Sequence, residues 1–486
     1  MIRISDAINA AYAAGIKPTR NFMRQFKYQS MFEQLLVFLN APKDENKADS
    51  RRIPWVAERL LLYMLRDSPE LYGNELATQT TVTTAINRCW RNTNATFKGN
   101  IEIESLTLFI RSVFIAQAPD QTDLNPAAFA RQIILCESLE ANSKLAALLS
   151  AKARISLEKF FEMAILAWRQ TSEVKPWFSQ EYVQKLAETY EAVDIDRFFA
   201  AFSFSLSDLQ VRFRNSAGSV SVDEWFQPSI FYRSPCVRQH GAIVPLGRPT
   251  LRRYLETFIA DTVDQSDDQQ IRQSWEKRVE RYVFETASRL GVEVLDEAGM
   301  RSRFALQTGL CCDVALIFPN AVVCIEVKTK NLNSSLPAAA SVRDMKAKFK
   351  ATLLSADEQL LNVVKGIRTQ QQFERLSIYS LIATSTELYL GGADDLLSAE
   401  WAERDLVRPL VVSLDDIDWL FEGQRLEKFQ MVSALEDFHA RLTEKPSALF
   451  AISQLRGEEK YAISTPEHLH EVMNACMSRI VARTVR

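Results

Sequence analysis

The first 213 residues carry apolar side chains at helical spacing. In the segments 53–66, 127–150 and 156–170 the apolar positions recur every three or four residues, which is the pattern of a helix with one buried face. We therefore expect residues 1–213 to form a large, mostly helical N-terminal domain.

Glycine, serine and proline interrupt this pattern between residues 215 and 249 and leave only short β-like pieces. We interpret residues 214–262 as a connector with short β elements. A helix is predicted next over 274–290, closed by Gly291. At about 100° per residue its apolar side chains form a single stripe, made of Trp275, Val279, Tyr282, Val283 and Leu290.

From residue 263 onward, helices and strands alternate. A helix is expected over 355–367, and apolar runs predict strands at 292–297, 312–318, 321–330, 376–384 and 408–414. These elements predict an α/β domain over 263–425 with a central mixed sheet. A helical C-terminal segment follows over 426–486, so the fold class of the whole chain is α+β.

Two of these strands carry charges where a buried strand should have none. In 321–330 the side chains of Glu326 and Lys328 share one face, and Asp313 lies at the start of the preceding strand. If the strands pair through the turn at Pro319 and Asn320, Asp313 lies opposite Glu326, about 5 Å away. Two carboxylates at that distance repel unless a positive charge lies between them. We therefore predict a divalent cation with oxygen ligands.

This arrangement resembles the PD-(D/E)xK nuclease superfamily, whose core is a helix, a strand, a hairpin carrying Asp and Glu-x-Lys, and a second helix. The resemblance covers roughly residues 270–390 and implies a restriction-endonuclease-like nuclease core. By the family pattern, Asp313 and Glu326 ligate Mg²⁺ or Mn²⁺, and Lys328 orients or activates the attacking water.

The resemblance assigns a role to two further residues. Glu280, in "VERYVFETASRLG", matches the glutamate of the family's first helix and would add to the metal site. Gln359, in "EQLLNVVKGI", matches a glutamine that some members place on the helix after the lysine. The sequence departs from the pattern at Cys312, where the motif has proline, and at Val363, where some subfamilies have tyrosine.

The Glu-x-Lys triplet alone is a weak signal for a nuclease site. An acidic residue also precedes a lysine by two positions at Glu45, Glu173, Asp344 and Glu458. Only Glu326 ends an apolar strand that follows an aspartate-bearing strand. The alternative interpretation of Glu326 and Lys328 is a structural ion pair at the sheet end, which is costly to bury. For Glu280 the alternative is a solvated helix edge.

The charge distribution favours a polyanionic partner. Residues 271–370 hold 15 Lys and Arg against 11 Asp and Glu, a net charge of +4, whereas the whole chain carries −3. The excess gathers at a predicted helix start that contains Arg343, Lys346, Lys348 and Lys350. This cluster is a candidate phosphate-contacting helix, and its alternative is a solvated helix face.

Cysteine and hydropathy patterns bound the class of protein. The seven cysteines include no Cys-x-x-Cys pair, which indicates reduced thiols in a cytoplasmic protein. No uncharged apolar run reaches the roughly 18 residues of a membrane span, so we expect no membrane partner. The expected partner is a nucleic acid, DNA first, with a homo-oligomer or an operon-encoded protein as a further partner.

By resemblance, the expected function is that of a Mg²⁺-dependent endonuclease, a phosphodiester hydrolase, in bacterial antiviral defence or DNA processing. Two alternatives stay open. One is an RNA-directed nuclease, because nothing in the motif selects DNA. The other is a nuclease-fold scaffold that binds nucleic acid while its helical region assembles partners.

Overall fold

The structure is a computed structural model, and most of the chain is placed in it. The described residues are 6–41, 54–97, 111, 115, 126–137, 139–140, 142–173, 175–215, 224, 228–306, 310–329, 342–390, 396–398, 400–403, 406–442 and 451–484. They form a mixed α+β fold that is mainly helical, with two mixed sheets. None of the helices in these ranges is long and apolar enough to cross a membrane.

The N-terminal region is helical, as its apolar pattern predicts. The single helix expected over 127–150 is wrong, because two helices form there. Ser143 caps the second one, and its Oγ accepts a hydrogen bond from the Ala146 N–H at 3.2 Å. The helices are α1 (Asp6–Met23), α2 (Tyr28–Asn40), α3 (Pro54–Arg66), α4 (Gln79–Phe97), α7 (Pro126–Glu137), α8 (Lys144–Ala153), α9 (Leu157–Gln170), α10 (Gln180–Ala187), α11 (Ala192–Ala200) and α12 (Leu206–Asn215).

The short β elements predicted for the connector belong to a three-stranded sheet. Its strands are β1 (Ser203–Ser205), β2 (Cys236–Gln239) and β3 (Ala242–Pro245), in that order. β1 runs parallel to β2, and β2 runs antiparallel to β3, so the sheet joins the helical region to the connector. Two helices follow, α13 (Arg248–Glu256) and α14 (Phe258–Asp264).

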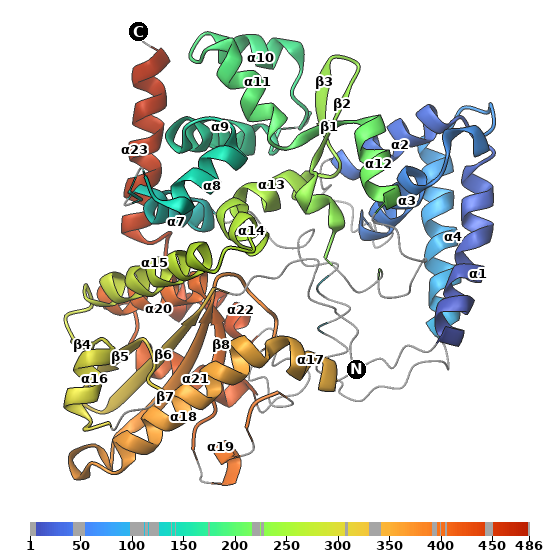
Figure 1. The fold of residues 1–486 in the computed structure, drawn as a ribbon. Helices are drawn as coiled ribbons and strands as arrows, with labels where there is room; N and C mark the ends of the chain where they lie inside the picture. Colours follow the sequence, from blue (N-terminus) through green and yellow to red (C-terminus); the bar gives the residue numbers. More distant parts are fainter. Residues whose placement is uncertain are drawn as a thin grey trace.

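The central sheet has five strands in the order β4-β5-β6-β7-β8. β4, β5 and β6 are antiparallel neighbours, whereas β6, β7 and β8 are parallel. The carboxyl ends of these last three strands therefore meet at one edge of the sheet, as Figure 1 shows. The strands are β4 (Glu293–Leu295), β5 (Val314–Ile317), β6 (Ala321–Lys328), β7 (Ser377–Thr384) and β8 (Leu410–Ser413).

Helices cover both faces of this sheet (Figure 1). α15 (Gln269–Ala287) and α20 (Leu414–Arg425) pack on one face, and α18 (Ser355–Arg368) packs on the other. Along β6 the residues Val323, Ile325 and Val327 enter the core on the side of α15, and Cys324 enters the core on the side of α18. Because side chains alternate along a strand, Glu326 and Lys328 lie on the α18 side.

The remaining helices lie around this core. α16 (Glu297–Arg303) and a π-helical segment (Lys350–Leu354) are not anticipated by the apolar pattern, whereas helix is expected throughout the last sixty residues. The sequence pattern also predicts a loop over 331–341, between the strand 321–330 and the basic helix start, and these residues lie outside the described part of the chain. The other helices are α17 (Val342–Phe349), α19 (Glu400–Glu403), α21 (Met431–Leu442), α22 (Ala451–Arg456) and α23 (Glu467–Thr484).

Helix α15 begins at Gln269, earlier than predicted, because Asp268 caps it: its Oδ1 accepts a hydrogen bond from the Gln270 N–H at 2.8 Å. All five residues of the predicted apolar stripe are buried. The helix ends at Ala287, and Gly291 has a φ of 70° in the turn that leads to β4. That left-handed conformation favours glycine.

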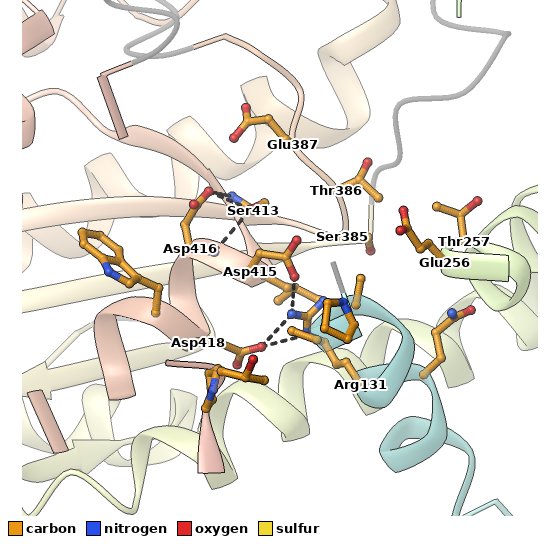
Figure 2. Close-up of a pocket in the computed structure, with 18 of the residues that line it drawn as sticks. Arg131, Glu256, Thr257, Ser385, Thr386, Glu387, Ser413, Asp415, Asp416 and Asp418 are labelled. Atoms are coloured by element: carbon orange, nitrogen blue, oxygen red, sulfur yellow. Dashed lines mark hydrogen bonds and ion pairs between the residues drawn. The ribbon is translucent and has the colours of Figure 1, made fainter. Parts of the chain in front are cut away.

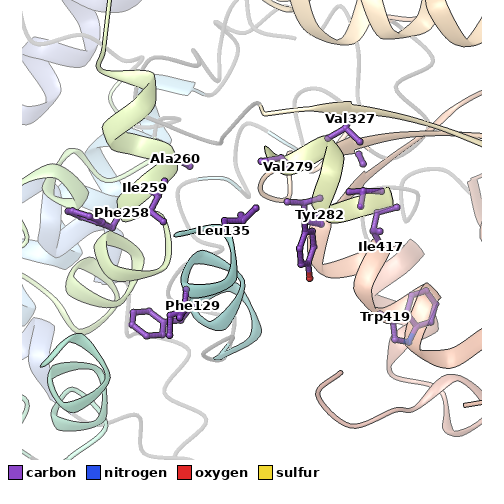
Figure 3. Close-up of a cluster of buried hydrophobic side chains, with 14 of the residues drawn as sticks. Phe129, Leu135, Phe258, Ile259, Ala260, Val279, Tyr282, Val327, Ile417 and Trp419 are labelled. Atoms are coloured by element: carbon purple, nitrogen blue, oxygen red, sulfur yellow. The ribbon is translucent and has the colours of Figure 1, made fainter. Parts of the chain in front are cut away.

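One hydrophobic core connects the helices α7 to α11 to the central sheet, whereas α1 to α4 pack in a separate core. Figure 3 shows Phe129 and Leu135 of α7 and Phe258 of α14 in the same cluster as Val279 of α15 and Val327 of β6. This packing fixes α7 and α14 beside the carboxyl edge of the sheet. The domain boundaries predicted at 213, 262 and 425 stay predictions.

Candidate active site

The two predicted carboxylates lie opposite each other at the end of the β5–β6 hairpin. Val314 pairs with Ile325, and the Asp313 N–H donates a hydrogen bond to the Ile325 carbonyl oxygen at 3.1 Å. The same register continued by one residue places Asp313 against Glu326. The pairing counted from the two-residue turn is therefore confirmed.

Glu326 is a buried carboxylate without full hydrogen bonding. Its side chain is 1% exposed, and its Oε1 accepts from the Lys328 ammonium. Its Oε2 has no hydrogen-bond partner within the described ranges. Burial, followed by the negative charge of Asp313, raises the pKa of Glu326 to about 8, against the opposing effect of Lys328. The raised pKa means that the Glu326 carboxyl group favours its protonated form near neutral pH.

Asp313 is held in place by the backbone of the opposite strand. Its Oδ2 accepts a hydrogen bond from the Val327 N–H at 2.7 Å. Burial raises the pKa of Asp313, while this hydrogen bond, the charge of Lys328 and a side-chain hydrogen bond with Glu326 act in the opposite direction. Both carboxylates of the pair are thus destabilised in their ionised form when no cation is bound.

Lys328 and Gln359 are brought together as the resemblance implies. The Lys328 Nζ donates to the Gln359 Oε1 at 3.1 Å, and the Gln359 Nε2 donates to the Cys311 carbonyl oxygen at 3.0 Å. Gln359 therefore connects α18 to the segment that carries Asp313 and fixes the lysine. An ammonium has three N–H donors, so contacts to Glu326 and Gln359 leave one for water or a phosphate oxygen.

Glu280 lies at the edge of the α15 stripe, where the helical pattern places it. It is half-buried, and burial, Asp313 and Glu276 raise its pKa to about 7, in that order of effect. Glu285 points to solvent, with its side chain 55% exposed and paired with Arg281 at 2.7 Å. The apolar stripe of α15 therefore turns Glu280, and not Glu285, toward the carboxylate pair.

The donor set fits a hard divalent cation. No group of three or more His, Cys, Asp or Glu side chains closes around a single point in the described part of the chain, so Glu280 is not a preformed third ligand. Mg²⁺ is usually bound by one or two carboxylates and keeps several waters or substrate phosphate oxygens. Asp313 and Glu326, with an unpartnered Oε2, suit that mode of binding.

The predicted phosphate-contacting residues lie on α17 and its extension. Lys346, Lys348 and Lys350, which we call the basic-helix lysines, are exposed, while Met345 and Phe349 turn inward. Arg343 lies in α17, but its side chain is outside the described part. The lysines therefore place three exposed positive charges on the segment that leads, through the π-helical turn, to α18.

Sequence reasoning missed a second group of polar residues, at the carboxyl ends of β7 and β8. It includes Ser385 and Glu387 after β7 and Asp415 and Asp418 in α20 (Figure 2). The sequence feature that could have identified these residues is their position directly after two predicted parallel strands, because ligands of open α/β sheets bind outside the carboxyl ends of such strands. Trp275 also reaches this region, although the stripe pattern identifies it only as a core residue.

Comparison with protein-family models, with curated proteins and with solved structures gives no match for this chain. Any function proposed for this chain therefore rests on the residues of the candidate site and on how the fold arranges them.

Proposed function

We propose that this protein is a Mg²⁺-dependent nuclease that hydrolyses phosphodiester bonds, with DNA as the first substrate to test. The observation that carries the proposal is the pair Asp313 and Glu326. Two carboxylates that lie opposite each other at a strand end, Glu326 buried and Asp313 half-buried, are explained by a cation site and are costly to keep otherwise.

Asp313 and Glu326 would hold the ion, and binding would displace the proton that Glu326 otherwise retains. A bound Mg²⁺ supplies polarisation of the phosphate and lowers the pKa of its water. The chain itself contributes orientation, since the Val327 N–H fixes Asp313 and Gln359 fixes Lys328.

Lys328 places a fixed positive charge beside the carboxylates, where charge develops on the phosphoryl oxygens. Glu280 has a pKa of about 7, so its carboxyl group can accept or release a proton near neutral pH. This value suits a group that receives a proton from the attacking water. The basic-helix lysines are exposed on the segment that leads to α18 and would contact the substrate backbone.

A substrate panel tests this function. Purified protein is incubated with supercoiled plasmid, single-stranded DNA and RNA in Mg²⁺ or EDTA, and Glu285→Gln serves as a control that leaves the site intact. We expect cleavage of DNA in Mg²⁺ and none in EDTA. Cleavage of RNA alone favours the RNA-directed alternative, and binding without any cleavage favours the scaffold.

A further inference from the structure

Four cationic side chains lie at helix ends where the helical region meets the connector. Lys152 and Arg154 stand at the end of α8, and Arg212 stands in the last turn of α12. Arg233 ends a short 3₁₀ helix, Ile230–Arg233. We call these four residues the junction cations. Because they come from three segments far apart in the sequence, no local run of charge produces the cluster.

The packing of the helices brings these three ends together. α8 packs against α14 (Figure 1), and the 3₁₀ helix packs against α13, which directly precedes α14. The rings of Phe213 in α12 and Phe231 in the 3₁₀ helix meet edge to face, with their centroids 5.3 Å apart. The ends of α8, α12 and the 3₁₀ helix therefore converge around α13 and α14.

The junction cations act on one another electrostatically. Burial, and then the positive charges of Arg212 and Arg233, lower the pKa of Lys152. Asp261 of α14 opposes this effect, and Arg154 adds to it. Burial and the charge of Arg233 also lower the pKa of Arg212. The four positive charges are therefore close enough to destabilise one another.

The protein leaves this positive charge largely uncompensated. None of the four side chains forms an ion pair with a residue that the structure describes. Arg154 and Arg212 are exposed, and Lys152 and Arg233 are half-buried, so solvent reaches the cluster. A cation at one helix end is explained by the helix dipole, but the convergence of three such ends is not. A surface of one sign attracts ligands of the opposite sign.

The span from the junction cations to the candidate active site is short compared with a nucleic acid. Lys152 is eight residues, about 12 Å of helix, from Lys144, whose Nζ pairs with the Asp268 Oδ2 at 3.0 Å. Asp268 caps α15, and Glu280 lies twelve residues, about 18 Å, further along. Together these stretches measure about 30 Å, close to one turn of duplex DNA.

We propose that the junction cations form a second phosphate-contact surface, which binds the backbone of a nucleic acid at a distance from the cleavage site. The choice of nucleic acid among polyanions rests on the proposed nuclease function. Contacts from lysine and arginine to phosphates fix the position of a nucleic acid without reading its sequence. The surface therefore raises the affinity for every sequence and holds the substrate across the helical region.

Binding of a duplex of about 24 base pairs, roughly 80 Å long, tests the proposal by fluorescence anisotropy over a range of salt. Single-stranded DNA and RNA of the same length are compared with it. Every protein is full length, carries Asp313→Ala and is kept in EDTA, so that binding is measured without cutting. Alanine at all four junction cations should weaken binding by at least about tenfold near physiological salt. It should also reduce the salt slope of log K by up to about 0.9 for each lost duplex-phosphate contact.

Two further variants keep the test sharp. Arg154→Gln combined with Arg212→Gln removes only the exposed pair, so this variant should fold, and it should lose about half of that slope. The matched control removes four exposed lysines on separate parts of the chain and should keep the wild-type slope within error. Its lysines are Lys17, Lys185, Lys428 and Lys460.

The outcomes separate this inference from the nuclease function. An unchanged slope in the junction variants, with or without a lower melting temperature, assigns the cations to the helix ends and overturns the inference. The function still stands if the wild type cuts DNA in Mg²⁺. An equal loss in the control variant indicates net charge alone and also overturns it.

Inorganic tripolyphosphate distinguishes a small-anion site from a backbone site. If it displaces the duplex as tightly as unlabelled duplex does, and the exposed-pair variant loses this competition, the junction binds small phosphates and the inference falls. A slope reduced only in the junction variants supports the inference even if no substrate is cut. If no nucleic acid binds the wild type, both proposals fall.

Discussion

Replacing Glu326 by glutamine should make the protein more stable at neutral pH, because the site holds a carboxyl group in an unfavourable environment. Burial and Asp313 raise its pKa from 4.5 to about 8 in the folded chain. Because the pKa is higher in the folded state, the protonated carboxyl group stabilises the folded state fully below pH 4.5. This contribution is lost as the pH rises toward 8. The unfolded chain releases this proton over that range, whereas the folded chain does not.

The magnitude follows from this difference. At about 1.4 kcal/mol per pH unit, the cost at pH 7.5, three units above 4.5, is about 4 kcal/mol in the free energy of unfolding. Glutamine keeps the shape of the side chain and still accepts a hydrogen bond from Lys328. We therefore expect Glu326→Gln to gain about 2–4 kcal/mol at pH 7.5, at roughly 1 °C of melting temperature per kcal/mol for a chain of 486 residues. Near pH 5 the two proteins should be almost equal.

Thermal unfolding at pH 5 and pH 7.5, with and without MgCl₂, measures this effect. Mg²⁺ should raise the melting temperature of the wild type at pH 7.5 and leave Glu326→Gln unchanged, because the ion binds the ionised carboxylate of the folded state. Glu285→Gln, an exposed glutamate on α15, serves as the control. The structural ion-pair alternative predicts the opposite sign, a loss of about 3–5 kcal/mol. A less stable variant at both pH values, with no response to Mg²⁺ in the wild type, refutes the reasoning.

Three other predictions concern the neighbouring residues. Lys328→Met should lower the cleavage rate by at least about tenfold, since 1.4 kcal/mol of lost charge stabilisation is tenfold in rate. Oligonucleotide affinity, measured by fluorescence anisotropy, should stay within roughly twofold. An equal loss of cleavage rate and of affinity indicates a role in binding alone. Alanine at all three basic-helix lysines should weaken binding and reduce the salt slope of log K by up to about 0.9 per lost duplex-phosphate contact, and an unchanged slope makes that helix a bystander. Glu280→Gln should slow cleavage strongly and abolish a rise of rate with pH near 7, whereas Glu285→Gln should be nearly silent; the reverse pattern contradicts the orientation of α15.

The local geometry of the carboxylate pair could be predicted from the sequence because a short hairpin fixes its own register. The turn at Pro319 and Asn320 leaves two residues between the strands, and the Phe318 N–H donates to the Ala321 carbonyl oxygen at 2.8 Å. Every later pair, including Asp313 with Glu326, follows from that turn. The rotation of α15 was equally accessible, since a single apolar stripe decides which glutamate faces the sheet.

The group of polar residues at the carboxyl ends of β7 and β8 could not be predicted in the same way. Arg131 and Asp418, which form an ion pair there, are 287 residues apart, and no local period relates them. The break between α7 and α8 was missed for a more local reason, because the cap at Ser143 overrides a continuous apolar pattern.

Cleavage by wild type and Asp313→Ala, purified identically and compared on the same DNA in Mg²⁺, tests the central claim most directly. The Asp313 carboxylate lies at the hairpin end, half-buried, where it accepts from the Val327 N–H, so the variant should fold with an unchanged circular dichroism spectrum. We predict that the wild type cuts and that the variant is slower by at least about 1,000-fold, because metal stabilisation contributes several kcal/mol to the transition state. Equal cleavage by both proteins, or cleavage by the wild type that persists in EDTA, would contradict a metal-dependent nuclease site at Asp313 and Glu326.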